Sequence, residues 1–241
     1  MNYIFNINNT IQNKHYCTIK EVQDYLIDFC NLNNYKNILE IGPGNYHFPI
    51  ANKFVGYNEK IEKYINIDMD EEPLPFSNRE LDFIYSRHVL EDIQNPNFAF
   101  REILRCSKSG YIETPSPLIE ITKGIDSHIG SEKYSGYLHH RYIIWSDIEK
   151  CEIFFLPKYS NIIDNFVQIY KPYEYYNLIN NDPLQWNNYF LWKDKTPKIT
   201  MYKNGVNFFL DADNYITLLN EAIATSIKNA EFFRKIILKN E

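Results

Sequence analysis

Apolar and polar residues follow two periods along this chain, one typical of helices and one typical of strands. Residues 18–31 carry an apolar stripe at helical spacing, and Thr18 and Glu21 have the spacing of a capping box. Residues 37–42 have the apolar run of a short buried strand. Pro49 follows and suits the first turn of a helix. The chain therefore begins with a predicted helix, strand and helix.

The same alternation continues to residue 115. Residues 63–70 predict a second strand, and residues 81–90 predict a third strand that passes into a helix. A helix over residues 99–106 then precedes a strand over residues 110–115. Strands that alternate with helices in this way predict an α/β fold, a mostly parallel sheet with helices on both faces.

The C-terminal half has weaker patterns. Residues 141–145 and 151–157 read as strands that could complete the sheet. Residues 199–211 suit a hairpin that turns at Asn204 and Gly205, and residues 215–238 have the apolar spacing of a long helix. We expect a single domain over residues 1–241, with a core over residues 17–158 and a C-terminal elaboration over residues 159–241.

The turn after the first strand is a candidate ligand site. In a parallel sheet, ligands bind at the carboxyl ends of the strands where the strand order reverses. Gly42 and Gly44 allow the backbone to bend sharply and approach a ligand closely, although a plain strand-to-helix corner uses the same residues. A dinucleotide fingerprint needs a third glycine where this chain has His47, which disfavours NAD(P). Asp68, at the end of the second predicted strand, favours another nucleoside cofactor with a ribose to hold.

Four segments in order resemble the signatures of class I S-adenosylmethionine (SAM)-dependent methyltransferases of the methyltransferase-11 type. They read LEIGPG, INIDMDEEPLPF, LDFIYSRHVLEDIQNP and FREILRCSKSGYIETPSP. The resemblance covers residues 38 to about 117. It implies a Rossmann-like sheet, SAM as the cofactor and methyl transfer as the reaction.

The resemblance also implies roles for individual residues. The methionine part of SAM would be surrounded by Glu40, Gly42 and Gly44, and Asp68 would hold the ribose. The adenine would be flanked by Met69, Leu74 and Phe76, and the pocket would be closed by Ser86 and Arg87. The chain departs from the family at Asp92, where a His is common, and at Ser109, where a glycine usually precedes Gly110.

Methyl transfer to a hydroxyl group needs a base near the methyl group, because the hydroxyl must lose a proton. By analogy with the family, His88 lies near that position, and His128, His139 and His140 lie in the segment that normally covers the substrate. We take His88 and His140 as the candidate catalytic residues. Each of them is also compatible with a purely structural role in a loop or a helix cap.

Charge and composition exclude several functions. The net charge is -6 and no run of Lys or Arg forms a basic stripe, so a nucleic-acid partner is disfavoured. No stretch approaches the roughly 20 apolar residues of a membrane span, and the first ten residues lack the pattern of a signal peptide, which favours a cytoplasmic location. The four cysteines are far apart, and we expect no metal site.

Elimination leaves a metal-free transfer to a hydroxyl group of a small molecule or sugar, or to an amine, because motifs typical of amide, adenine, cytosine and metal-dependent catechol methyltransferases are absent. Aromatic residues between Tyr173 and Trp192 could recognise such an acceptor, or form a small core or a homodimer contact. An alternative is an inactive, methyltransferase-like protein that binds SAM or serves as a partner subunit. The absent family His at Asp92 favours that alternative.

Overall fold

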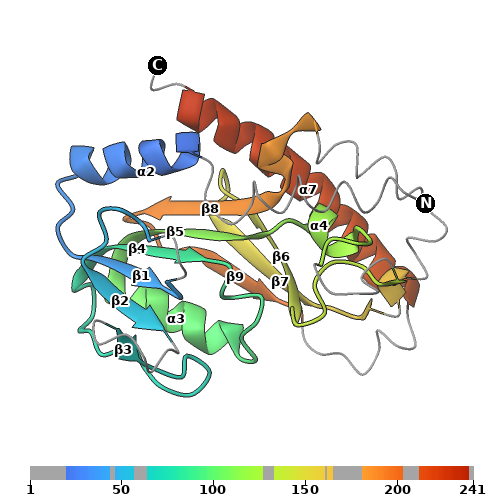
Figure 1. The fold of residues 1–241 in the computed structure, drawn as a ribbon, viewed down its shortest axis with the longest axis horizontal. Coiled ribbons are helices and arrows are strands. Elements are labelled where there is room, and N and C mark those ends of the chain that lie inside the picture. Colours follow the sequence, from blue (N-terminus) through green and yellow to red (C-terminus); the bar gives the residue numbers. More distant parts are fainter. Residues whose placement is uncertain are drawn as a thin grey trace.

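The computed structural model describes residues 20–43, 47–56, 64–126, 133–160, 162–164, 181–202 and 212–238. Two sheets form its centre (Figure 1). The larger sheet has six strands in the order β3-β2-β1-β4-β5-β8, and the smaller sheet has the order β6-β7-β9.

Five neighbouring strands of the larger sheet are parallel. They are β3 (Ile65–Asn66), β2 (Lys53–Gly56), β1 (Ile38–Ile41), β4 (Leu81–Arg87) and β5 (Ser107–Pro115). The chain adds strands on one side of β1 and then returns to add β4 and β5 on the other side, so the strand order reverses between β1 and β4. β8 (Asn187–Lys193) completes the sheet antiparallel to β5.

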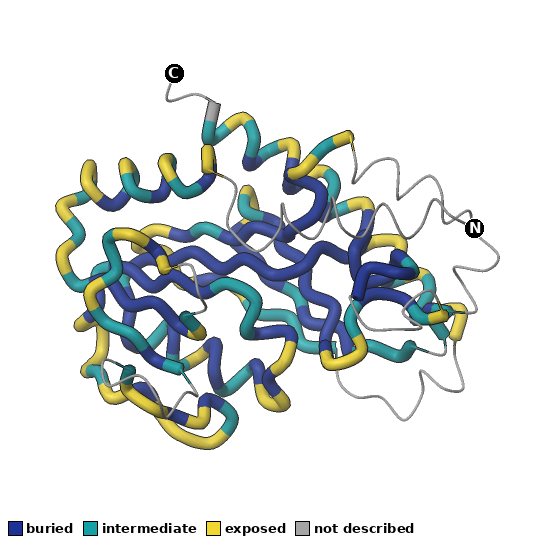
Figure 2. The backbone as a smooth tube through the Cα atoms, viewed as in Figure 1, coloured by how far each residue is buried: buried dark blue, intermediate teal, exposed yellow. Residues whose placement is uncertain are grey.

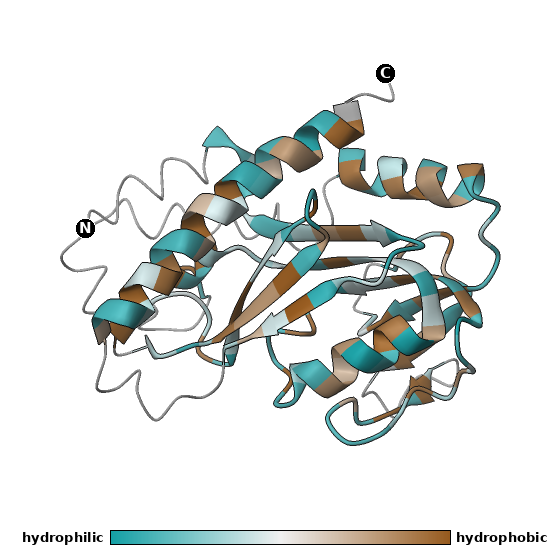
Figure 3. Cartoon of the chain, turned by 180° about the vertical axis from the view of Figure 1, so that it is seen from behind, coloured by the Kyte–Doolittle hydropathy of each residue, from teal (hydrophilic) through white to brown (hydrophobic). Residues whose placement is uncertain are grey.

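Helices cover both faces of this sheet, as Figures 1 and 3 show. On one face lies α3 (Pro96–Cys106), whose Phe100 packs 6.0 Å, centroid to centroid, from the Trp192 ring of β8. On the other face lie α2 (Lys20–Leu32) and α7 (Ala212–Leu238), and Phe233 of α7 stacks on Tyr189 at 4.7 Å. The strands between them are buried (Figure 2). The predicted α/β class, a Rossmann-like and mostly parallel sheet with helices on both faces, is confirmed.

The prediction of a helix that begins near Pro49 is wrong. Phe48 is buried and stacks on Tyr85 at 4.6 Å, and the next residues form a turn. The Asn52 side chain then accepts a hydrogen bond from the Ile38 backbone and donates one to the Lys36 carbonyl. These bonds align the chain beside β1, so residues 53–56 form β2 instead of continuing a helix.

The helix predicted directly after β4 is also absent from the described residues. The chain makes turns over residues 88–95, and α3 begins only at Pro96. Asn95 caps α3, since its side chain accepts a hydrogen bond from the Phe98 backbone at 3.3 Å. Pro96 occupies the first turn, where a missing N–H costs nothing.

The strands predicted over residues 141–145 and 151–157 exist, but they do not complete the main sheet. β6 (Tyr142–Asp147) and β7 (Glu152–Pro157) pair with each other, and β9 (Lys198–Met201) joins β7 in parallel. The edge of the main sheet is taken by β8, which lies beyond residue 158. Gly110 permits this arrangement, because a side chain there would overlap the Trp192 ring.

The aromatic residues in β8 and directly before it belong to the core. Trp186, Tyr189, Phe190 and Trp192 are all buried, which disagrees with a role as an open platform for the acceptor. Tyr173, Tyr175 and Tyr176 lie outside the described residues, as do Thr18 of the expected capping box and the Asn204-Gly205 turn. The long C-terminal helix is confirmed as α7. Two short helices complete the described elements, α4 (Pro117–Ile121) and the 3-10 helix η2 (Pro183–Gln185).

Candidate active site

Three loops meet at the carboxyl ends of the strands, where the strand order reverses. Gly42 ends β1 with a φ of +66°, and a Cβ atom at this position would overlap the Val89 side chain of the loop after β4. At the end of β2, a Cβ on Gly56 would come within 3.3 Å of Pro43 Cδ. A side chain at Gly42 would therefore clash with Val89, and one at Gly56 would be tightly packed against Pro43. Gly44, the second glycine of the predicted turn, lies outside the described residues.

Glu40 lies beneath this turn and is almost completely buried. Its Oε2 accepts a hydrogen bond from the Phe48 backbone at 3.1 Å and lies 3.4 Å from His47 Nδ1. Burial raises the pKa of the Glu40 carboxyl, and the contacts with Phe48 and His47 offset part of that rise. Since both contacts reach the same oxygen, they hold the carboxylate in one orientation at the end of β1.

Asp68 is placed differently from the sequence expectation. It follows β3, the edge strand, and not the strand beside β1. Its side chain is exposed and accepts a hydrogen bond from the Asp70 backbone at 2.9 Å. The strand beside β1 ends at Gly56, and the residues that follow lie outside the described part. The ribose role of Asp68 therefore stays a prediction. In the sheet, β2 and β1 lie between the strand before Asp68 and β4.

The predicted adenine-flanking residues lie against the core beside α3. Met69 and Leu74 are buried, and Phe76 packs on the same cluster. Arg105 fixes this segment by donating hydrogen bonds to the carbonyls of Leu74 and Phe76, at 2.9 and 2.7 Å. The segment is thus rigid, and its contact with adenine stays a prediction.

Ser86 and Arg87 end β4 and face different surroundings. Ser86 pairs in register with Ile41 of β1, and its buried Oγ finds no hydrogen-bond partner among the described residues. Arg87 Nε instead donates to Glu113 Oε1 of β5 at 3.0 Å. The same carboxylate accepts hydrogen bonds from Tyr111 and Asn187, so Glu113 is the centre of a buried polar network at the ends of β4, β5 and β8.

His88 stands directly after β4 and beside that network. Its Nδ1 lies 3.2 Å from Glu91 Oε1, and its Nε2 lies 4.0 Å from Glu113 Oε1. Its backbone has a φ of 51°, an unfavourable conformation for a residue with a side chain, and its N–H donates to the Glu113 carbonyl at 2.9 Å. The structure thus holds the imidazole between two buried carboxylates, and its Nε2 has no hydrogen-bond partner within the described chain.

His140 belongs to a second buried group. Its Nδ1 lies 2.6 Å from Glu120 Oε1, and Lys158 donates to the other oxygen of Glu120. Burial opposes the ionisation of Glu120, but the positive charges of Lys158 and His140 more than offset it and lower the pKa of Glu120 to about 2. Burial likewise opposes protonation of His140, yet the neighbouring carboxylates, Glu120 first, raise its pKa.

The two candidate histidines lie on either side of one acidic pair. His88 contacts Glu91, and His140 Nε2 lies 3.9 Å from Asp92 Oδ1. His139 approaches the same Asp92 oxygen at 3.9 Å, whereas His128 lies outside the described residues. Sequence reasoning missed Glu113, Glu120 and Lys158. The available signal was an acid inside an otherwise apolar run, Glu113 in GYIETP and Glu120 in PLIEI.

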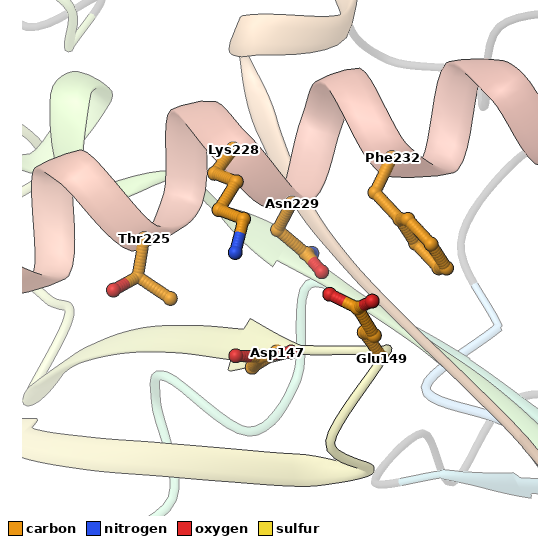
Figure 4. Close-up of a pocket in the computed structure, with 6 residues that line it drawn as sticks. All are labelled: Asp147, Glu149, Thr225, Lys228, Asn229 and Phe232. Atoms are coloured by element: carbon orange, nitrogen blue, oxygen red, sulfur yellow. The ribbon is translucent and has the colours of Figure 1, made fainter.

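A shallow pocket lies elsewhere, between α7 and the β6–β7 turn. Figure 4 shows its lining residues, which are Asp147, Glu149, Thr225, Lys228, Asn229 and Phe232. None of the predicted site residues lines this pocket, so it does not contribute to the candidate site.

Sequence comparison matches one part of the chain to a known family. Residues 34–112 match the sequence model of a family described as "Methyltransferase domain". These residues contain β1 to β4, α3 and the start of β5, together with the glycine turn and His88. Over these residues the chain therefore matches a methyltransferase domain, which supports the resemblance to class I SAM-dependent methyltransferases. No curated protein matches the chain.

Several solved structures are similar to part of the chain. A SAM-dependent methyltransferase from Mesorhizobium loti has 20% identity over 36% of this chain and 50% of its own, with a TM-score of 0.30. A methyltransferase from Bacillus halodurans, described as putative, has 17% identity over 39% of this chain and 51% of its own, with a TM-score of 0.32. The chain thus spans about half the length of these two structures.

No helix within the described residues is both long and apolar enough to cross a membrane.

Proposed function

We propose that the protein transfers the methyl group of SAM to a hydroxyl group of a small molecule or sugar. The observation that carries this proposal is the position of His88, directly after β4 and beside the reversal of strand order. Its Nδ1 lies next to the buried carboxylate of Glu91, and its Nε2 is unpaired within the described chain. A base with this arrangement can accept a proton from a hydroxyl group.

The cofactor position in this proposal is the junction of the loops after β1 and β4. When bound, SAM supplies a methyl group on a positively charged sulfur, which favours direct displacement by a nucleophile. Gly42 lets the turn after β1 pack against Val89 of the loop after β4, and Glu40 provides a fixed carboxylate below the turn. Ser86 Oγ, buried and unpaired among the described residues, adds a polar group on the β4 side.

In the proposed reaction, residues of the chain orient the base and exclude water. Glu91 orients the imidazole of His88 so that Nδ1–H faces the carboxylate and Nε2 is left to accept the proton. The loops after β1 and β4 exclude water around the transferred group, since Val89 packs directly on Gly42. The transfer requires no metal ion.

Unpaired buried polar atoms support a hydroxylated acceptor. In addition to Ser86 Oγ, the side-chain oxygens of Asn187 and Gln185 are buried and have no hydrogen-bond partner within the described chain. Asn187 begins β8 and binds the Glu113 network through its other side-chain atom. An acceptor with several hydroxyl groups, such as a sugar, can satisfy such groups.

Calorimetric titration with S-adenosylhomocysteine tests the cofactor assignment. We expect a dissociation constant in the range of about 1 μM to 1 mM, the usual range for enzyme substrates. Glu40→Gln should weaken binding about 10-fold or more, the usual effect of losing a hydrogen bond to a charged group. Gln94→Ala, an exposed change on the loop after β4, is the matched control and should leave binding unchanged. Absence of binding at millimolar concentration would overturn the proposal.

The second candidate function is an inactive, SAM-binding partner subunit. It is favoured by Asp92, which stands where the family often has a His. This candidate also binds S-adenosylhomocysteine, so it is distinguished by the absence of methyl transfer to any acceptor in a panel of hydroxylated compounds.

A further inference from the structure

Asp92, His139 and His140 bring three metal-binding groups together outside the contacts used by His88. One ligand atom from each lies within 4.8 Å of the others. Asp92 Oδ1 is 3.9 Å from His139 Nε2 and 3.9 Å from His140 Nε2. Asp92 belongs to the turn after β4, and the two histidines belong to the loop before β6.

We propose that Asp92, His139 and His140 bind a divalent transition-metal ion of the zinc type. Two imidazole nitrogens and one carboxylate oxygen match the ligands of three-residue zinc sites that leave a fourth position for water. Imidazole ligands favour zinc, cobalt or nickel over magnesium or calcium. The site was not predicted from the sequence, because its ligands come from two distant loops.

The spacing allows the ion to enter with small side-chain movements. In a tetrahedral zinc site, ligand atoms about 2.1 Å from the metal are about 3.4 Å from each other. Each 3.9 Å pair must therefore shorten by about 0.5 Å. The Asp92 and His139 side chains are 44% and 59% exposed, so they are free to adjust, whereas His140 is buried.

Glu120 prepares His140 as a metal ligand. The 2.6 Å contact between Glu120 Oε1 and His140 Nδ1 directs the Nδ1 proton to the carboxylate. His140 Nε2 then presents its lone pair toward Asp92. A buried carboxylate behind a ligating histidine is the usual outer partner of a zinc site, because it fixes the ring and its tautomer. Lys158 forms an ion pair with Glu120 and compensates its charge, so Glu120 is not left as an uncompensated buried carboxylate when no metal ion is bound.

Glu91 supplies an independent indication of missing positive charge. It is next to Asp92 and 1% exposed; its Oε1 lies 3.2 Å from His88 Nδ1, and its Oε2 has no hydrogen-bond partner within the described chain. A divalent ion on Asp92 would compensate negative charge at this point. It would also clamp the loop before β6 onto the turn after β4, where Arg141 N already donates to the Glu91 carbonyl at 2.7 Å.

The test is a titration of the full-length, EDTA-treated and dialysed protein with Zn²⁺, repeated with Co²⁺. We expect one equivalent of Zn²⁺ to bind, and Co²⁺ to give the visible absorption of a four-coordinate site. His139→Gln and Asp92→Asn should each weaken Zn²⁺ binding at least 10-fold. Glu120→Gln should weaken it about 10- to 100-fold through the loss of the outer carboxylate.

His47→Gln is the matched control, since His47 is a half-exposed histidine on another loop, and Zn²⁺ affinity should not change. Because His139 is exposed, its replacement leaves folding intact, which circular dichroism checks. The proposal is overturned if the parent protein binds less than one equivalent at 100 μM Zn²⁺, or if both His139→Gln and Asp92→Asn bind as tightly as the parent. These outcomes are independent of S-adenosylhomocysteine binding and of methyl transfer.

Discussion

Lys158→Met should lower the free energy of unfolding by about 3–5 kcal/mol, the usual cost of breaking a buried ion pair by removing one partner. The Lys158 and Glu120 side chains are each 1% exposed. Lys158 donates to Glu120 Oε2 and, at 2.7 Å, to the Tyr137 carbonyl. Methionine has a similar volume but carries no charge, so Glu120 would remain buried and keep its contact with His140 but lose its compensating cation. Urea denaturation followed by circular dichroism measures the change.

The matched control is the double variant Glu120→Gln with Lys158→Met. The glutamine removes the uncompensated charge while keeping an acceptor for His140, so the double variant should be more stable than Lys158→Met alone. A loss below 1 kcal/mol for the single variant, or no recovery in the double variant, would show that this pair is exposed to water in solution.

His88→Gln should reduce kcat for methyl transfer by about 10²- to 10⁴-fold, the usual contribution of a general base. Glutamine keeps the size of the side chain and a polar end near Glu91, but it cannot accept the proton. Binding of S-adenosylhomocysteine should be unchanged, because His88 is proposed to act on the acceptor. The assay follows a labelled methyl group from SAM into the best acceptor of a hydroxylated panel.

Gln94→Ala again serves as the control and should keep the kcat of the parent. A second variant, Glu91→Gln, tests the positioning role. It should lower kcat less than His88→Gln and shift the pH dependence of kcat, because Glu91 is proposed to act through His88. Equal kcat in His88→Gln and the parent would assign proton removal to another group. No transfer by the parent to any acceptor would favour the inactive candidate.

The sequence predicted those parts of the fold that depend on local patterns. β1, β4 and β5 have short apolar runs, and the amphipathic stripe of residues 99–106 lies within α3. β2 was missed because Pro49 suggested a helix start, whereas the burial of Phe48 and the Asn52 hydrogen bonds, which depend on β1 and β4, decide otherwise. Tertiary contacts thus override the local signal of one proline.

In the candidate site, too, some residues could be proposed from the sequence and others could not. Gly42 was proposed because it follows a strand that the sequence shows clearly, whereas Glu40 and His88 were proposed from the resemblance to the methyltransferase family, and their roles stay predictions. Asp68 follows the predicted strand, but that strand is the third and not the second, because the unrecognised strand β2 lies before it; the ribose role of Asp68 stays a prediction. Glu113, Glu120 and Lys158 were missed because their importance comes from burial and from partners far away in the chain. Spacing along the sequence carries no information about such partners.

Hydrogen–deuterium exchange with and without S-adenosylhomocysteine examines cofactor binding and its location together. We expect slower exchange with the ligand in peptides that contain Gly42 and in peptides that cover residues 88–92, where the loops after β1 and β4 meet. Unchanged exchange in both regions at saturating ligand, or protection confined to the pocket beside α7, would show that the cofactor does not bind between these loops.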